Sequence, residues 1–145
     1  MPEQKRIKFE IVTPERVVLK EEVLQVTVPT IEGEITVLPK HSPLVSILKP
    51  GVLEMKKLDG TIEIASVSGG FVEVLLNKVI ILADTAERAE EIDLERAEEA
   101  RKKAEESLKN LRSVDASQFA TLTALMEKEL ARTRTAKRWR NLKGR

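Results

Sequence analysis

The sequence predicts an α+β protein, with an antiparallel β-sandwich or barrel followed by a two-helix hairpin. All six prolines and five of the six glycines in the 145 residues precede Asp84. Val, Ile and Thr, which favour strands, are dense before this point. Ala, Leu, Glu, Lys and Arg, which favour helices, make up almost everything after it. We therefore expect two domains, at residues 1–85 and 86–145.

Three short segments of the first domain alternate apolar and polar residues, which is typical of strands with one buried face. Their apolar residues are Ile7, Phe9 and Ile11, then Leu24, Val26 and Val28, then Ile62 and Ile64. The more continuous apolar runs at 72–76 and 79–82 predict central strands. Asn77-Lys78 between them predicts a two-residue turn with Asn at positive φ, and Asp59-Gly60 predicts a hairpin.

Apolar residues of the second domain fall at three- and four-residue steps, as in amphipathic helices. The first helix has Asp93 as its N-cap and a stripe that, Arg101 aside, consists of Leu94, Ala97, Ala104, Leu108 and Leu111. After a break at 112–114, Asp115 and Gln118 predict a capping box. The second stripe consists of Phe119, Leu122, Leu125, Met126 and Leu130. So short a connection requires antiparallel helices.

Charge is distributed unevenly along the helical domain. Residues 86–106 carry nine acids and five bases, whereas residues 128–145 carry eight bases and one acid. The basic end calls for an acidic partner, such as nucleic acid, anionic lipid or an acidic protein surface. Each helix has a single narrow stripe, so the pair should be marginally stable and able to exchange its own contacts for those of another protein.

Nothing in the sequence predicts a catalytic or metal site. The chain has no cysteine and one histidine, His41, in a loop bracketed by prolines, where packing or hydrogen bonding is favoured over catalysis. Neither an HxH nor an HExxH motif indicates zinc. The charged start has no apolar stretch like that of a signal peptide, and no apolar run approaches the ~20 residues that span a bilayer. We expect a soluble protein without enzymatic activity.

Helix register raises a possible anion site. If Leu111 faces Ser117, then Arg96 lies level with Arg132 across the hairpin, with Lys103 and Lys128 along the same seam. Four cations in one seam repel each other unless an anion lies between them. The alternative, which spacing alone favours, is that they point to water or pair with nearby glutamates.

Several motifs together resemble the epsilon subunit family of bacterial F-type ATP synthases, called delta in mitochondria. In order they are Gly33-Glu34-Ile35, Leu38-Pro39-Lys40-His41-Ser42-Pro43-Leu44, Lys49-Pro50-Gly51-Val52, Ser68-Gly69-Gly70-Phe71-Val72-Glu73-Val74, Leu82-Ala83-Asp84-Thr85-Ala86-Glu87 and Ile92-Asp93-Leu94-Glu95-Arg96-Ala97. The last is similar to the family's IDxxRA motif. The resemblance covers nearly the whole chain.

The resemblance implies a flattened β-sandwich and a non-catalytic rotor subunit of the central stalk in a proton-translocating enzyme. The sandwich would bind the gamma subunit, and Glu34 and His41 would lie in the region facing the c-ring. The helical domain would extend to the catalytic beta (and alpha) subunits and block ATP hydrolysis, through Lys128, Arg132, Arg134, Lys137 and Arg138. The implied location is peripheral, on the cytoplasmic face of the bacterial plasma membrane.

Some members of the family hold the folded hairpin in place with a regulatory ATP. The resemblance would assign that role to Glu87, Ile92, Asp93, Arg96, Ala97 and Arg132. Lys103 and Lys128 stand where ATP-binding members have arginine, and lysine cannot make arginine's forked phosphate contact. No cofactor is required by this account.

Two other functions compete with an inhibitory stalk subunit. One is a purely structural stalk subunit with an inert helical tail. The other is an adaptor that binds nucleic acid through the basic tail, although that tail has one aromatic residue, Trp139, and so no stacking platform.

Overall fold

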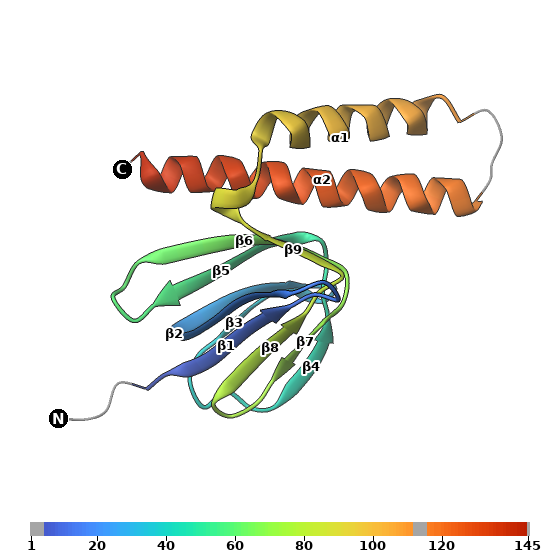
Figure 1. Cartoon of the computed structure of the whole chain (residues 1–145). Coiled ribbons are helices and arrows are strands. Elements are labelled where there is room, and N and C mark those ends of the chain that lie inside the picture. The colour runs from blue at the N-terminus through green and yellow to red at the C-terminus, as the bar shows by residue number, and fades with distance from the viewer. Residues whose placement is uncertain (1–4, 112–115, 145) are drawn as a thin grey trace.

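The computed structural model describes residues 5–111 and 116–144 and shows a β-sandwich followed by two packed helices (Figure 1). The strands are β1 (Ile7–Val12), β2 (Val17–Thr30), β3 (Gly33–Val37), β4 (Leu44–Ile47), β5 (Gly51–Lys57), β6 (Ile62–Ser68), β7 (Phe71–Val74), β8 (Lys78–Leu82) and β9 (Thr85–Arg88). A 3-10 turn, η1 (Ala89–Glu91), leads into α1 (Leu94–Lys109) and α2 (Ala116–Lys143). The predicted fold class is confirmed.

The strands follow the order β4-β7-β8-β1-β2-β5-β6-β9, with β3 also paired to β2. Pairing is antiparallel except between β1 and β8, which run parallel. With 14 residues, β2 is long enough to pair with β1, β3 and β5 and so joins the two layers of the sandwich. The predicted joint between the domains, at Thr85, lies at the start of β9, which pairs with β6.

The core belongs to the sandwich alone. Its largest fully buried members include Phe9, Ile11, Leu53 and Met55, and the whole cluster lies between residues 7 and 86. Because no helical residue joins this cluster, we expect the sandwich to fold without the helices.

One strand prediction was wrong in detail, and another is confirmed. Val23 is buried in place of Leu24, because a bulge between Val23 and Gln25 shifts the alternation of β2 by one residue. The runs at 72–76 and 79–82 supply β7 and β8, and both strands are central as predicted, since each is paired on both sides. Their inward residues are Val72, Val74, Val79 and Ile81, and their outer faces are partly open.

The two predicted turns differ from their expected forms. Between β7 and β8, the Leu75 amide donates to the Lys78 carbonyl at 2.8 Å, so the turn is centred one residue earlier. Asn77 does not take a positive φ; among the described non-glycine residues only Lys40 does, at 66°. The hairpin at Asp59-Gly60 is confirmed, with a loop widened to three residues and Gly60 at φ 88°.

The helices agree with the prediction at the start of α1 and depart from it in α2. Asp93 caps α1 by accepting a hydrogen bond from the Arg96 amide at 3.2 Å, and Ala97 and Ala104 are buried. The predicted stripe of α2 is only partly buried: Leu122, Met126 and Leu130 are half-buried, whereas Phe119 is 57% exposed. Leu125, predicted alongside it, is 41% exposed. The buried residues of α2 are instead Glu129, Ala131, Thr133, Thr135 and Ala136. The predicted break at 112–114 and cap at Asp115 lie outside the described residues.

Gly70 should tolerate no side chain. Its φ is 89°, and an added Cβ would overlap the carbonyl oxygen of Leu82 on the neighbouring strand. We expect Gly70→Ala to lower the free energy of unfolding by ~2–4 kcal/mol, because backbone strain and a steric clash with backbone add together. Gly33→Ala is the control, since Gly33 has φ 118° but open space around it, and should cost only ~1 kcal/mol. Urea unfolding measures both values, and equal losses would contradict the steric account.

Candidate functional site

The surface where α2 meets the sandwich brings together most of the predicted functional residues. α2 lies between α1 and the sandwich, over β5 and β6 (Figure 1). On β6, Ala65 and Val67 point into the core, so the alternate residues Ile64 and Ser66 point outward, where α2 buries them. Thr133 and Thr135 of α2 satisfy their hydroxyls on the carbonyls of Glu129 and Ala131. With small or polar residues dominating the buried part of α2, specific ion pairs must fix its position.

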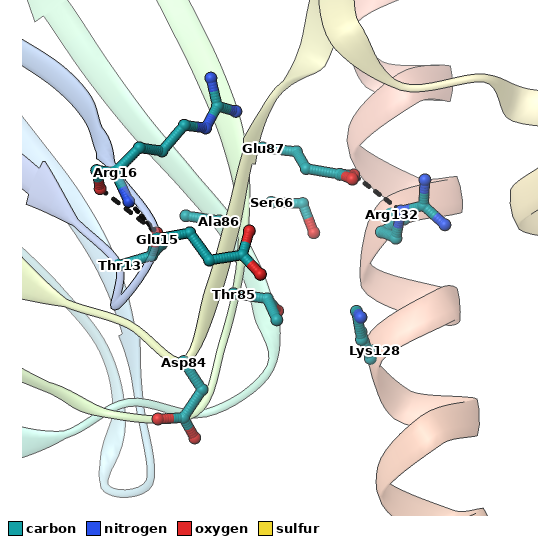
Figure 2. A pocket seen from close by; sticks show the side chains of 10 residues that line it. All are labelled: Thr13, Glu15, Arg16, Ser66, Asp84, Thr85, Ala86, Glu87, Lys128 and Arg132. Atoms are coloured by element: carbon teal, nitrogen blue, oxygen red, sulfur yellow. Dashed lines mark hydrogen bonds and ion pairs between the residues drawn. The ribbon is translucent and has the colours of Figure 1, made fainter.

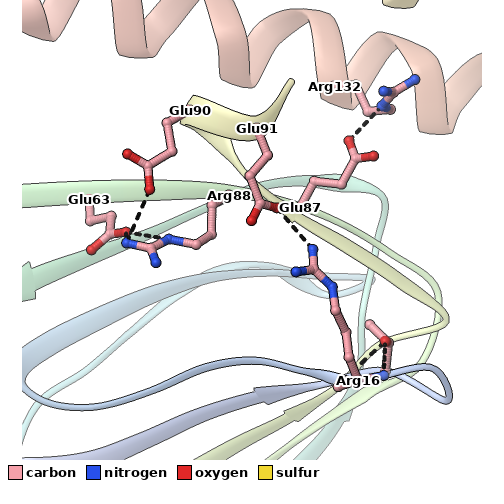
Figure 3. Close-up of polar contacts among 8 residues, drawn as sticks. Arg16, Glu63, Glu87, Arg88, Glu90, Glu91 and Arg132 are labelled. Atoms are coloured by element: carbon pink, nitrogen blue, oxygen red, sulfur yellow. Dashed lines mark hydrogen bonds and ion pairs between the residues drawn. The ribbon is translucent and has the colours of Figure 1, made fainter. Parts of the chain in front are cut away.

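Arg132 is the centre of this interface. Its Nε donates to Glu87 Oε2 of β9 at 2.7 Å (Figure 3). Its Nη1 donates to Glu129 Oε2 on α2, also at 2.7 Å. Burial alone would lower the pKa of Arg132, but the hydrogen bonds that it donates to Glu87 and Glu129 outweigh burial and hold that pKa above its usual value. The Glu129 side chain is only 6% exposed, so Arg132 is the compensating charge for a buried carboxylate.

A cavity of about 260 Å³ lies beside this cluster, between α2 and the β1–β2 turn. Lys128 and Arg132 line it from α2, and Glu15, Asp84 and Glu87 line it from the sandwich (Figure 2). Cations of α2 therefore face acids of the sandwich across the cavity, whose sandwich side also carries Arg16.

The predicted anion seam is not formed. Arg132 points to the sandwich, whereas the Arg96 side chain is 84% exposed and has Asp93 of its own helix at 3.8 Å. Lys103 is exposed on α1 and does not line the cavity. Of the residues that the resemblance assigns to ATP, the structure brings together Glu87, Lys128 and Arg132; Ile92, Asp93, Arg96 and Ala97 are at the start of α1. Helical spacing had favoured the alternative in which these cations point to water or pair with nearby glutamates, and Arg132 does pair with Glu129.

Three of the five predicted inhibitory residues are already paired with acids of the same chain. Arg132 binds Glu87, Arg138 binds Glu54 of β5, and Lys137 lies 3.3 Å from Glu98 of α1. Lys128 lines the cavity, and Arg134 is exposed with no ion pair among the described residues. Sequence reasoning missed Glu54 because it lies 84 positions from Arg138, and only the fold brings the two together.

A second ion pair ties the segment before α1 to the sandwich. Arg16, in the β1–β2 turn, donates to Glu91 of η1 at 2.9 Å (Figure 3). The hydrogen bond from Arg16 lowers the pKa of Glu91 despite partial burial of the carboxyl.

This pair should make a small contribution to acid sensitivity. Because the pKa of Glu91 is lower in the folded chain than in the unfolded chain, the ion pair stabilises the fold at pH values above the unfolded pKa. This stabilisation is lost as the pH falls through the folded pKa. At neutral pH, Arg16→Gln should lower the free energy of unfolding by ~0.5 kcal/mol or less, because the two side chains are 50% and 38% exposed. When the pH is lowered below about 4.5, the free energy of unfolding should fall less in Arg16→Gln than in the parent chain. Urea unfolding from pH 7 to pH 3 measures this. Arg6→Gln, which breaks a separate exposed pair with Glu22, serves as control; parallel pH profiles for Arg16→Gln and the parent chain would contradict the assignment.

A row of exposed apolar side chains crosses the outer face of the sandwich away from α2. Strand register places Ile47, Phe71, Leu82, Val12 and Val17 in line across β4, β7, β8, β1 and β2. Ile47 is 57% exposed, Phe71 43% and Val17 59%. We call these five residues the apolar row. Sequence reasoning missed it because its members come from five separate segments.

The predicted c-ring residues lie toward opposite ends of β3: Glu34 is its second residue, next to the β2–β3 turn, and His41 follows its last residue in the β3–β4 loop. Glu34 is exposed on β3, and His41 lies in the β3–β4 loop with its Nδ1 2.7 Å from the Ser42 carbonyl oxygen. The Lys40 amide donates to the Leu76 carbonyl, which joins this loop to the β7–β8 turn. Exposed Leu38, Leu75 and Leu76 lie on these two segments.

Comparison with known proteins agrees with this architecture. Residues 6–89 match the model of the ATP synthase, Delta/Epsilon chain, beta-sandwich domain. The chain belongs to this family. It is 47% identical over 135 residues to the ATP synthase epsilon chain of Herpetosiphon aurantiacus, covering 93% of this chain and 97% of that one. It is 53% identical over 104 residues to the epsilon chain of Dehalococcoides mccartyi, and the match covers 71% of this chain and 73% of that one.

A solved structure extends the likeness to three dimensions. A chain of the Euglena gracilis mitochondrial ATP synthase, in an OSCP/F1/c-ring structure, matches with TM-score 0.75 and 29% identity, over 87% of this chain and 78% of that one. The resemblance seen in the motifs is thereby confirmed. Epsilon chains are non-catalytic subunits, so this member of the family is an accessory subunit and not an enzyme. Neither helix in the described part of the chain is long and apolar enough to cross a membrane.

Proposed function

We propose that the chain is a central-stalk subunit of a proton-translocating F-type ATP synthase, and that its helical domain inhibits ATP hydrolysis when it leaves the sandwich. The observation that carries this proposal is the pairing of Arg132, Lys137 and Arg138 with the chain's own acids. In the docked state these cations are neutralised. Once α2 is released, they are free to bind acidic segments of the catalytic beta and alpha subunits.

The apolar row is the proposed contact with the gamma subunit. Exposed apolar side chains that adjoin one another on a sheet mark an interaction surface. The row lies toward the β4 end of the strand order, whereas α2 covers β5 and β6. The sandwich can therefore hold gamma while the helices are either docked or released, which an inhibitor that stays on the rotor requires.

The proposed c-ring contact is the β3–β4 loop together with the β7–β8 turn. His41 supplies a polar group here, and Leu38 and Leu76 are more than half exposed on the same two segments. Glu34, toward the other end of β3, would be a separate contact with the ring. A partly apolar surface with polar neighbours suits a protein partner. Contact with the c-ring places the chain peripherally at the cytoplasmic face of the bacterial plasma membrane.

Docking of the helices requires no nucleotide in this account. Arg132 already has Glu87 and Glu129 as partners at 2.7 Å, so a phosphate would have to displace carboxylates from it. Arg96 is exposed to solvent and Lys103 lies outside the cavity. The chain's own acids hold the cation that the resemblance would assign to a regulatory ATP.

Binding to gamma tests the stalk assignment. The full chain should bind a gamma-containing catalytic complex of a relative such as the Herpetosiphon aurantiacus ATP synthase. The two should co-elute in gel filtration at both 150 and 500 mM salt, because salt screens an apolar contact only weakly. Binding that requires nucleic acid and disappears steeply with salt would instead favour the adaptor. No co-elution at either salt concentration would contradict the stalk assignment.

A further inference from the structure

The last two turns of α2 make contacts of their own with the sandwich. α2 runs to Lys143, so the basic extension after Arg138 is helical through that residue. Arg138 binds Glu54 on the outer face of β5. The next residue, Trp139, lines a recess of about 200 Å³ between the β5–β6 hairpin and η1, together with Ile62, Glu63 and Arg88.

We propose that Arg138 and Trp139 form a latch that holds the helical domain on the sandwich and sets how readily it is released. The proposal goes beyond an inhibitory helix: it assigns a holding role to a segment that the family resemblance does not account for. The end of a helix normally frays. Here the end is joined to β5 by a charge pair, and the largest side chain of α2 borders a recess of the sandwich.

The recess is built from residues that hold one another in place. Arg88 on β9 donates to Glu63 on β6 and also lies 3.4 Å from Glu90 of η1 (Figure 3). Lys57, at the end of β5, lies 3.4 Å from the other oxygen of Glu63. The sandwich walls that share the recess with Trp139 are therefore braced by ion pairs, which favours a defined surface for the indole to pack on.

The outer side of Trp139 is covered from its own helix. Lys143, one turn later, places its ammonium 4.4 Å from the centre of the indole ring. The ring thus borders the sandwich recess and also contacts a cation of its own helix. Because Arg138 is neutralised by Glu54 only while α2 is docked, opening the latch frees a basic residue at the same moment as it frees the helix.

The latch and the Arg132 cluster hold α2 at two separate points. Six residues separate Arg132 from Arg138, or ~9 Å along the helix. Breaking the latch should therefore release the C-terminal end of α2 first, with the Arg132 cluster still closed. This stepwise release distinguishes a latch from a uniform interface, which would open along its whole length at once.

Intrinsic fluorescence tests the proposal directly, because Trp139 is the only tryptophan and the chain has no tyrosine. Acrylamide quenching in the isolated full chain reports how far the docked sandwich shields the indole from solvent. We expect Arg138→Glu and Glu54→Arg each to raise the quenching constant about threefold, since the pair becomes a like-charge repulsion. The double variant, with the charges exchanged, should return close to the parent value.

Arg134→Glu is the matched control, with the same charge change on an exposed residue of the same helix that has no ion pair among the described residues. It should leave quenching unchanged. Far-UV circular dichroism confirms that each variant is folded, and if Glu54→Arg fails that check, the comparison of Arg138→Glu with Arg134→Glu decides alone. Equal quenching in those two variants, or no recovery in a folded double variant, would overturn the latch. The isolated chain suffices, so this result is independent of the proposed inhibitory function.

Discussion

A Phe71→Asp chain should lose its binding to the gamma-containing complex while remaining folded. Phe71 is at the second position of the apolar row and is 43% exposed, so aspartate can be accommodated in the free protein. In the complex, the carboxylate would be buried against an apolar partner without compensation. Aromatic residues at the centre of an interface commonly contribute most of its affinity, so we expect a loss of ~100-fold or more, measured by titration of the complex with labelled chain.

Leu125→Asp is the control for this prediction. Leu125 is 41% exposed, close to the value for Phe71, but it lies on α2 and outside the apolar row. It should bind gamma with unchanged affinity. Equal losses in the two variants would show that a new surface charge weakens binding wherever it lies, and unchanged binding by Phe71→Asp would remove the row from the interface.

Arg132→Ala should detach the helical domain from the sandwich. The change leaves Glu129, with a side chain only 6% exposed, as an uncompensated buried charge and also removes the partner of Glu87. Breaking such a buried pair costs ~3–5 kcal/mol, which is enough to shift a marginally docked domain toward its released state. Amide hydrogen exchange should show protection lost across α2 while β1, β2 and β5 keep theirs.

A second substitution separates this effect from general damage. Adding Glu129→Gln to Arg132→Ala removes the stranded charge and should restore part of the protection of α2. Arg134→Ala removes an exposed cation from the same helix and should change nothing. If Arg132→Ala lost no protection in α2, or lost it equally in the sandwich, the Arg132 cluster would not be what holds the domains together.

The division of the chain into strands and helices could be predicted because it rests on local chemistry. Period-two alternation identified β1, and the carboxylate of Asp93 identified the start of α1. The bulge in β2 could not be predicted, since Leu24 and Val23 are both apolar and only the pairing with β5 determines which one points inward. Local sequence patterns therefore identify strands and helices, whereas the register of a strand is set by the strands with which it pairs.

The same limit explains the error in α2. A single apolar stripe was expected because a hairpin in isolation has one internal seam. In the structure α2 is covered by α1 on one side and by β5 and β6 on the other, so small and polar residues such as Ala131 and Thr135 are buried while Phe119 is exposed. The pairing of Arg138 with Glu54, and the alignment of Ile47, Phe71 and Leu82, likewise exist only after the sheet has formed.

ATP hydrolysis is the measurement that tests the central claim most directly. The catalytic complex with gamma would receive either the full chain or residues 1–91, which keep the whole sandwich core, with binding of both forms verified. The account predicts that both forms bind and that only the full chain suppresses hydrolysis. Equal hydrolysis with both forms bound would contradict it and leave the chain a purely structural subunit of the stalk.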